Sequence, residues 1–202
     1  MATKEELKQV LRELNEQGDV PAIKARATEF LRGVDAHTLS LAEQELEQEG
    51  MDDEALRKLC AVHLEVLGEG LEQQRPEVAA DHPIGILMDE HKIILQNLEE
   101  LREISDRVRA AASLSEIEGQ LPRLKAISHL LLDTESHHRR EEETIFPRLE
   151  SYGVTGPPRI MRLEHEELRA KKRRLAELVE QAGSLSYEEL AKELELAASS
   201  SP

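Results

Sequence analysis

Two stretches of the sequence, ILMDEHKIIL at 86–95 and IMRLEHEEL at 160–168, place the same dipeptide, Glu-His, on an apolar stripe of helical spacing. The segments that follow them also match, because SLSEIE begins at Ser113 and SLSYEE begins at Ser184. Two similar helical hairpins in succession are typical of an up-down four-helix bundle with pseudo-twofold symmetry. The sequence therefore predicts such a bundle at 83–202. Its helices are expected at about 83–111, 115–150, 157–181 and 186–198, the second with an adjustment around Gly119 and Pro122.

The N-terminal third carries a separate helical pattern. Apolar residues recur at helical spacing, and Gly or Pro marks most of the breaks between the segments. The polar stretch before Pro83 contains Pro76 and lacks this spacing, which is typical of a linker. We therefore predict a small helical domain at 1–70, a linker at 71–82 and the bundle at 83–202. Within the first domain, helices are expected at about 3–17, 21–33, 37–48 and 53–67.

The composition predicts an all-α protein and excludes several functions. Ala, Leu, Glu, Lys and Arg dominate, and aromatic residues make up only 2%. The 42 acidic and 26 basic residues leave a net charge of −16, which disfavours nucleic-acid binding. The basic run at 169–174 is typical of a solvated helix face. The single cysteine, Cys60, forms no internal disulfide, and no long apolar run or signal peptide is present, so we expect a cytoplasmic protein without a membrane partner.

The segment HLLLDTESHHRREEETIFP at 129–147 carries the chemistry. His137 and Glu141 are four residues apart and therefore neighbours on one helix face. An imidazole and a carboxylate at that spacing bind one metal ion or bridge two, and they suit iron, manganese or zinc. Metal sites in bundle cores take such pairs from facing helices. His91 and His165, each expected on the buried stripe of another helix, would complete the site.

These motifs resemble the hemerythrin-like HHE cation-binding family over about 82–175. The matching elements are DEH ending at His91, HHRREEETIFP at 137–147 and GPPRIMRLEH ending at His165. Residues 1–70 also resemble a small helical domain of unknown function that often precedes HHE domains. Its matching stretch is EGMDDEALRKLCAVH at 49–63.

The resemblance implies a non-haem iron site, commonly a carboxylate-bridged di-iron centre. Family members bind or sense O2 or NO, handle iron, or take part in the repair of damaged iron centres. Carried over by motif, the implied ligands are His91, His137, Glu141 and His165. Periodicity instead puts His138 at the centre of the apolar face, which makes it a reserve ligand. The other reserve ligands are Glu142, His129, Asp133 and His82, of which the last three are more simply surface or helix-entry residues.

The fourth helix departs from the family pattern, which has further ligands there. His137 follows Ser115 by 22 residues, and the same interval after Ser186 reaches position 208, beyond Pro202. No histidine follows His165. We therefore expect a short or truncated fourth helix and a site for one metal ion with open positions. A second copy of the chain, as a homodimer, would complete the bundle.

Two functions remain open at this point. The first is an iron-binding protein that senses or binds O2, NO or a redox signal, or handles iron, with zinc or manganese as alternative metals. The second is a helical interaction or regulatory module with an incomplete or lost metal site. Nothing favours an enzyme, because the sequence contains no nucleophile motif and no phosphate-binding loop. Cys60 and His63 are too few to make a zinc site and are interpreted as core residues.

Overall fold

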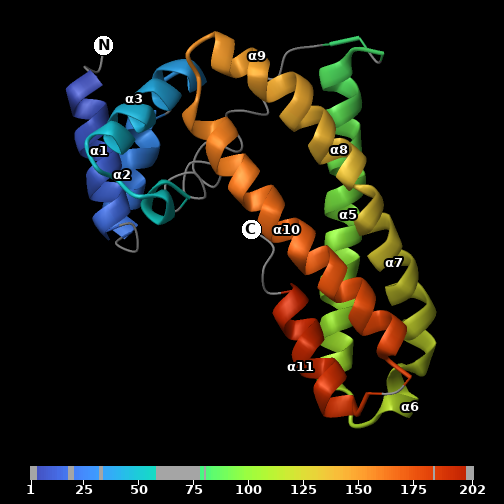
Figure 1. Cartoon of the computed structure of the whole chain (residues 1–202). Coiled ribbons are helices and arrows are strands. Elements are labelled where there is room, and N and C mark those ends of the chain that lie inside the picture. The colour runs from blue at the N-terminus through green and yellow to red at the C-terminus, as the bar shows by residue number, and fades with distance from the viewer. Residues whose placement is uncertain are drawn as a thin grey trace. The chain divides into compact units, whose positions relative to one another are not determined.

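A computed structural model of the chain describes residues 4–17, 21–31, 34–57, 78–79, 81–183 and 185–198. Every regular element in these ranges is helical, which confirms the all-α prediction (Figure 1). None of the described helices carries an apolar stretch long enough to cross a bilayer. The chain divides into two compact units, one formed by 1–77 with 144–163 and the other by 78–143 with 164–202.

The first unit contains three N-terminal helices that pack on one another. Their bounds are α1 at Lys4–Gln17, α2 at Pro21–Leu31 and α3 at Ala36–Gln48, all within two residues of the predicted ones. Asp35 caps α3 by accepting a 2.9 Å hydrogen bond from the amide of Thr38. The core is apolar, as the helical spacing predicted. It contains Leu7, Val10, Leu11, Leu14, Ala27, Leu31, Leu39, Ala42 and Leu46.

The predicted helix at 53–67 is described only over its first turn, 53–57. The rest of it, including Cys60 and His63, lies outside the described residues, as does most of the predicted linker. The first unit also includes α9, Phe146–Ser151, and the beginning of α10, Gly156–Gln181. There Arg159 forms an ion pair with Glu47 at 2.8 Å and donates a hydrogen bond to Asp53 at 2.5 Å.

The second unit is the four-helix bundle (Figure 1). Its first helix, α5, runs Pro83–Ala110, and its last, α11, runs Tyr187–Ala198 and packs on α5. A capping box begins α11: the Ser186 amide donates to Glu189 Oε2 at 2.9 Å, and the Glu189 amide donates to Ser186 Oγ at 3.3 Å. Between these helices the chain forms α6 at Leu114–Ile117, η1 at Glu118–Gln120, α7 at Leu121–Asp133, α8 at Glu135–Arg140, η2 at Glu141–Ile145, and then α9 and α10.

The second helix of the bundle is adjusted near Gly119, where η1 lies, as predicted, but it is also interrupted further along, which the prediction for 115–150 did not include. It is interrupted at Thr134, whose hydroxyl donates to the carbonyl of Leu131 at 2.7 Å and so competes with the helical backbone bonds. It then widens into the π-helical turn η2. Pro147 accounts for the second change, because it has no amide hydrogen to offer the carbonyl of Glu143 four residues earlier.

Only the C-terminal part of α5 is covered by α11. The bundle core joins Leu190 and Leu194 of α11 to Leu101, Ile104 and Val108 of α5. With 12 residues against 28, α11 is less than half as long as α5. Leu95 was expected in the apolar stripe but is 64% exposed. Among the described residues, no fourth-helix residue reaches this part of α5.

Truncation of Leu194 to Ala tests the packing of α11. Leu194 is fully buried, so the free energy of unfolding should fall by about 2–5 kcal/mol. Leu130→Ala, at a leucine that is 43% exposed, serves as the control and should change it by no more than about 0.5 kcal/mol. Urea denaturation followed by circular dichroism measures both, and equal effects would contradict the described position of α11.

Candidate metal centre

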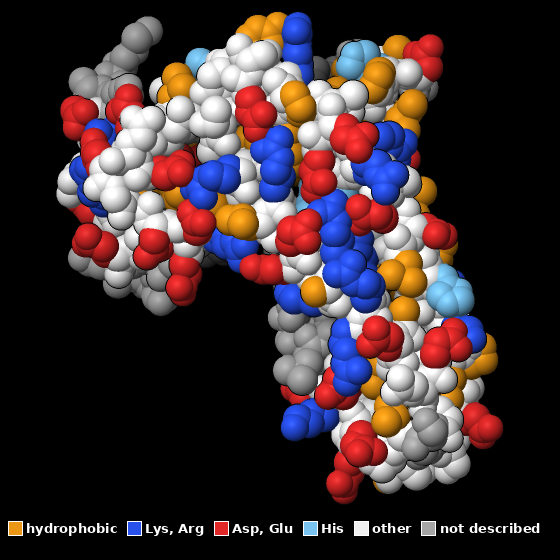
Figure 2. Space-filling view, viewed as in Figure 1, with side chains coloured by type: hydrophobic (Ala, Val, Ile, Leu, Met, Phe, Trp, Pro, Cys, Tyr) orange, Lys and Arg blue, Asp and Glu red, His pale blue; other side chains and the backbone are white. Residues whose placement is uncertain are grey.

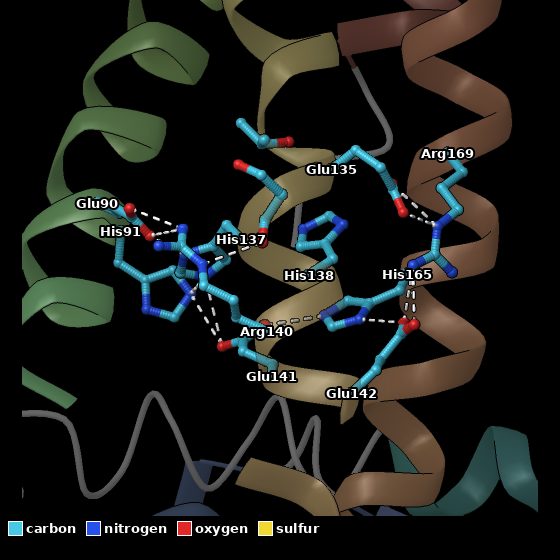
Figure 3. A network of polar contacts seen from close by, with 12 residues as sticks. Glu90, His91, Glu135, His137, His138, Arg140, Glu141, Glu142, His165 and Arg169 are labelled. Atoms are coloured by element: carbon cyan, nitrogen blue, oxygen red, sulfur yellow. Dashed lines mark hydrogen bonds and ion pairs between the residues drawn. The ribbon is translucent and has the colours of Figure 1, made fainter. Parts of the chain in front are cut away.

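Three helices of the second unit bring the histidines and carboxylates together (Figure 3). Helix α5 carries His91, α8 carries His137, and α10 carries His165. Glu141 and its neighbour Glu142 begin the π-helical turn η2. Adjacent residues in this turn serve different partners, because Glu141 faces all three of these imidazoles while Glu142 reaches only His165.

The first half of the cluster consists of His91, His137 and one oxygen of Glu141. The Nε2 atoms of His91 and His137 are 3.1 Å apart. Glu141 Oε1 lies 3.4 Å from His137 Nε2 and 3.8 Å from His91 Nε2. One ligand atom from each of the three residues lies within 4.8 Å of the others, which is compatible with a shared metal ion.

The second half of the cluster consists of His165 and the other oxygen of the Glu141 carboxylate, Oε2. Glu141 Oε2 is 3.4 Å from His165 Nε2. This oxygen is buried and has no hydrogen-bond partner among the described residues, and the Glu141 residue as a whole is only 6% exposed. Buried polar atoms are rarely left without a partner. The carboxylate of Glu141 thus stands between imidazoles on both sides, and its second oxygen lacks a donor.

Outer carboxylates fix the orientation of two of the imidazoles (Figure 3). His137 Nδ1 lies 2.8 Å from Glu90 Oε2, and His165 Nδ1 lies 2.8 Å from Glu142 Oε1. Arginines hold these carboxylates in turn: Arg140 donates to Glu90 at 2.6 Å and Arg169 donates to Glu142 at 2.9 Å. The same sequence of imidazole, carboxylate and guanidinium therefore occurs twice.

This arrangement determines which imidazole nitrogens are available. Burial raises the pKa of Glu90, but Arg140 and His137 lower it by more, so the net shift is downward. The carboxylate is therefore ionised and only accepts hydrogen bonds. His137 must then carry its proton on Nδ1. In the neutral ring, Nε2 presents a lone pair toward Glu141, which is itself an acceptor. Two acceptors that face each other favour a cation between them, either a proton or a metal ion. The other group within donating distance of His137 Nε2 is His91 Nε2, at 3.1 Å.

The electrostatics of Glu141 point in the same direction. Burial raises its pKa, but its contacts with His137 and His165 lower the pKa more strongly, to about 2. Burial lowers the pKa of His137, and Glu141 and Glu90 more than reverse this and raise it. The buried carboxylate therefore stays ionised and attracts positive charge. Imidazole nitrogens with a carboxylate are a donor set for iron, manganese or zinc, so the residues present fit a metal ion.

Comparison with protein families agrees with this geometry. The family model described as the hemerythrin HHE cation-binding domain matches residues 82–199, more than half of the chain. The chain belongs to the hemerythrin HHE cation-binding family. A family of unknown function, DUF438, matches residues 7–73. No curated protein and no solved structure matches the chain.

Within the hemerythrin HHE domain, the reserve residues take other roles. His138 is buried, as periodicity predicted, but its ring stacks on His165 with centroids 4.0 Å apart and does not join the His91 cluster. Glu142 is an outer carboxylate. His129 and Asp133 are exposed, and His129 lies 3.6 Å from Glu180. His82 caps α5 by accepting a hydrogen bond from the Ile84 amide at 3.2 Å.

His91 differs from its predicted environment. Its side chain was expected on a buried stripe, yet it is 52% exposed. The reason is the extent of α11, which packs on the part of α5 beyond Leu98 and leaves His91 uncovered among the described residues. Glu90, although adjacent to His91 in the sequence, contacts His137.

Sequence reasoning missed the inward-facing basic residues. Arg140 is exposed and also holds Glu90. Figure 2 shows Lys and Arg side chains along α10, as the basic run at 169–174 predicted. Two members of that run are turned inward. Arg169 contacts Glu135 and Glu142, and Lys172 is 8% exposed. The available signal was spacing, since Arg169 lies four residues after His165.

The two adjacent histidines of α8 should titrate very differently in the metal-free protein. Burial, His165 and Lys172 lower the pKa of His138 to about 3, so this ring should stay neutral between pH 8 and 5. His137 should become protonated above the ordinary value of 6.5 as the pH falls. Nitrogen-15 NMR of the imidazoles measures both. In the Glu141→Gln variant the pKa of His137 should fall, because Glu141 raises it. Titration of His138 near pH 6.5, or an unchanged His137 pKa in that variant, would contradict the described charges.

Proposed function

We propose that this hemerythrin HHE domain binds iron at Glu141, with His91, His137 and His165 as the nitrogen ligands. The observation that carries the proposal is the buried Glu141 carboxylate, which has imidazole nitrogens on both oxygens and one oxygen without a hydrogen-bond donor among the described residues. Membership of a cation-binding family supports it independently. Metal-bound histidines usually donate their other nitrogen to a carboxylate, which is the role of Glu90 and Glu142 here.

The two oxygens of Glu141 are unequally supplied with ligands. His91 and His137 lie on the Oε1 side, whereas His165 alone lies beside Oε2. We infer one principal ion on the first side, with a second ion bound more weakly across the carboxylate. Mixed nitrogen and oxygen donors favour iron, and manganese and zinc are the alternatives.

We further propose that the bound iron meets O2, NO or a redox signal. Iron with open coordination positions would supply the reversible binding of a diatomic ligand. Two nitrogen donors and one carboxylate oxygen on the principal ion leave such positions open. The half-exposed His91 offers a route from solvent, while His137 and His165 stay buried and keep their orientation through Glu90 and Glu142. The residues of this chain thus position the ligands and admit small molecules from the α5 side.

Metal binding is tested by anaerobic titration of the metal-free full chain with Fe(II). Wild type should bind between one and two equivalents, measured by elemental analysis after desalting. Glu141→Gln and His137→Asn should each weaken metal binding at least about tenfold, because each removes a side chain that would coordinate the metal ion directly. Glu143→Gln and His129→Asn change exposed groups and are the matched controls. Absence of stoichiometric uptake of Fe(II), Mn(II) or Zn(II) by wild type would refute the proposal.

The diatomic ligand is tested on the same iron-loaded protein. Addition of NO or O2 should produce new absorption bands in the visible range, and Glu141→Gln should lose them together with the metal. An iron-loaded wild type whose spectrum is unchanged by either gas would exclude this part of the proposal and retain metal binding alone.

A second candidate function is an interaction module. The observation in its favour is the exposed apolar surface of α5, where Leu95 is one turn from His91 and Ile93 is 57% exposed. We propose that a second copy of the chain packs on this surface and covers His91. Partners of this kind bury exposed apolar patches.

Sedimentation of the full chain tests this dimer. Leu95→Glu should shift the equilibrium toward the monomer by at least about tenfold in dissociation constant, because it would bury an unpaired charge. Leu130→Glu changes a 43% exposed leucine on α7 and should leave the mass unchanged. A wild-type chain that remains monomeric at high concentration rules the dimer out.

A further inference from the structure

A small cavity lies in the bundle beyond the core that α11 helps to form. Its volume is about 60 Å³, and it is bounded by α5, the α7–α8 segment and α10. Leu101, Leu131 and Leu175 belong both to its lining and to the apolar core. The remaining apolar lining comes from Ile94, Leu98 and Leu168, and the polar lining from Thr134, His138 and two lysines.

One of these lysines, Lys172, is a buried cation without a carboxylate partner. It is 8% exposed, and its Nζ donates to Thr134 Oγ1 at 2.8 Å and lies 3.4 Å from His138 Nδ1. No carboxylate oxygen of the described residues lies within 4 Å of Nζ. The acidic groups nearby are already engaged, because Glu135 and Glu142 both accept hydrogen bonds from Arg169.

The surroundings leave the charge of Lys172 undercompensated. Burial lowers its pKa, Glu135 opposes this, and Arg169 and Arg173 lower the pKa further. A buried ammonium without an ionic partner loses solvation free energy that nothing replaces. An ammonium has three hydrogens to donate, and its two neighbours here account for two. The third hydrogen remains for an acceptor that enters the cavity.

We propose that this cavity binds a short aliphatic monocarboxylate of two to four carbons, with its carboxylate on Lys172 Nζ and its alkyl chain among Ile94, Leu98 and Leu168. The apolar lining disfavours an inorganic anion, which has no alkyl part to bury. A neutral alcohol would leave the ammonium uncompensated. The volume also limits the length of the chain, because an apolar protein cavity of about 150 Å³ holds a benzene molecule.

This site is distinct from the proposed iron centre and does not depend on it. Its cation is Lys172, and none of the four implied iron ligands lines the cavity. The two sites are nevertheless adjacent, because the lining residue His138 stacks on His165. An occupied cavity would therefore alter the environment of one iron ligand without contacting the metal ion.

The test is calorimetric titration of the metal-free full chain with sodium propionate at constant ionic strength. Wild type should bind one equivalent with a millimolar or lower Kd, and propan-1-ol and sodium chloride should bind at least tenfold more weakly. Lys172→Met keeps the length of the side chain but removes its charge, and it should weaken propionate binding at least tenfold. Lys125→Met removes an exposed lysine that pairs with Glu180 and should have no effect.

A second variant guards against loss of folding. Leu98→Phe keeps the charge of Lys172 but fills the cavity, and it should abolish propionate binding while circular dichroism shows an intact bundle. The proposal is overturned if wild type does not saturate with propionate, if Lys172→Met binds it equally well, or if chloride competes equally. If octanoate bound as tightly as propionate, the proposed limit of two to four carbons would be wrong. Iron loading is not required, so failure here leaves the iron proposal standing.

Discussion

The burial of one ionised carboxylate, that of Glu141, constrains the whole second unit. A buried charge is tolerated only with close compensation, and here the compensation comes from imidazoles on α5, α8 and α10. These three helices must therefore keep both their rotation and their offset along the bundle. Beyond His137 and His165, carboxylates and then arginines continue the alternation of charge outward. The network thus reaches from the centre of the bundle to its surface.

The apolar core and the polar side chains of the bundle lie in different parts along its length. Where α11 packs on α5, leucines and isoleucines form a closed core. Beyond α11 the interior becomes polar, with His138, Lys172 and the Glu141 cluster. This part is also more open, as the exposure of His91 and the cavity beside Lys172 indicate. A site that exchanges small molecules with solvent requires such an opening, whereas a closed apolar core would exclude them.

Much of the fold could be predicted because helices are local structures. The capping box of Ser186 and Glu189 needs only residues three apart, and the start of α5 needs only Pro83 after His82. Family membership was predicted as well, from motifs that the family model matches. For the two histidines of α8, two kinds of local sequence pattern gave different predictions. The motif register placed His137 in the cluster, the periodicity placed His138 in the interior, and the structure buries both.

The sequence by itself determined the helices, their apolar faces and the spacing of His137 and Glu141, because these depend on residues within a few turns. Only the tertiary structure decided which side chains meet. Glu90 contacts His137 instead of its neighbour His91, Arg169 and Lys172 turn inward from a basic run, and His91 remains half exposed. These outcomes depend on the rotation and offset of whole helices. Both are determined by packing between segments far apart in the chain, which no pattern within a single helix specifies.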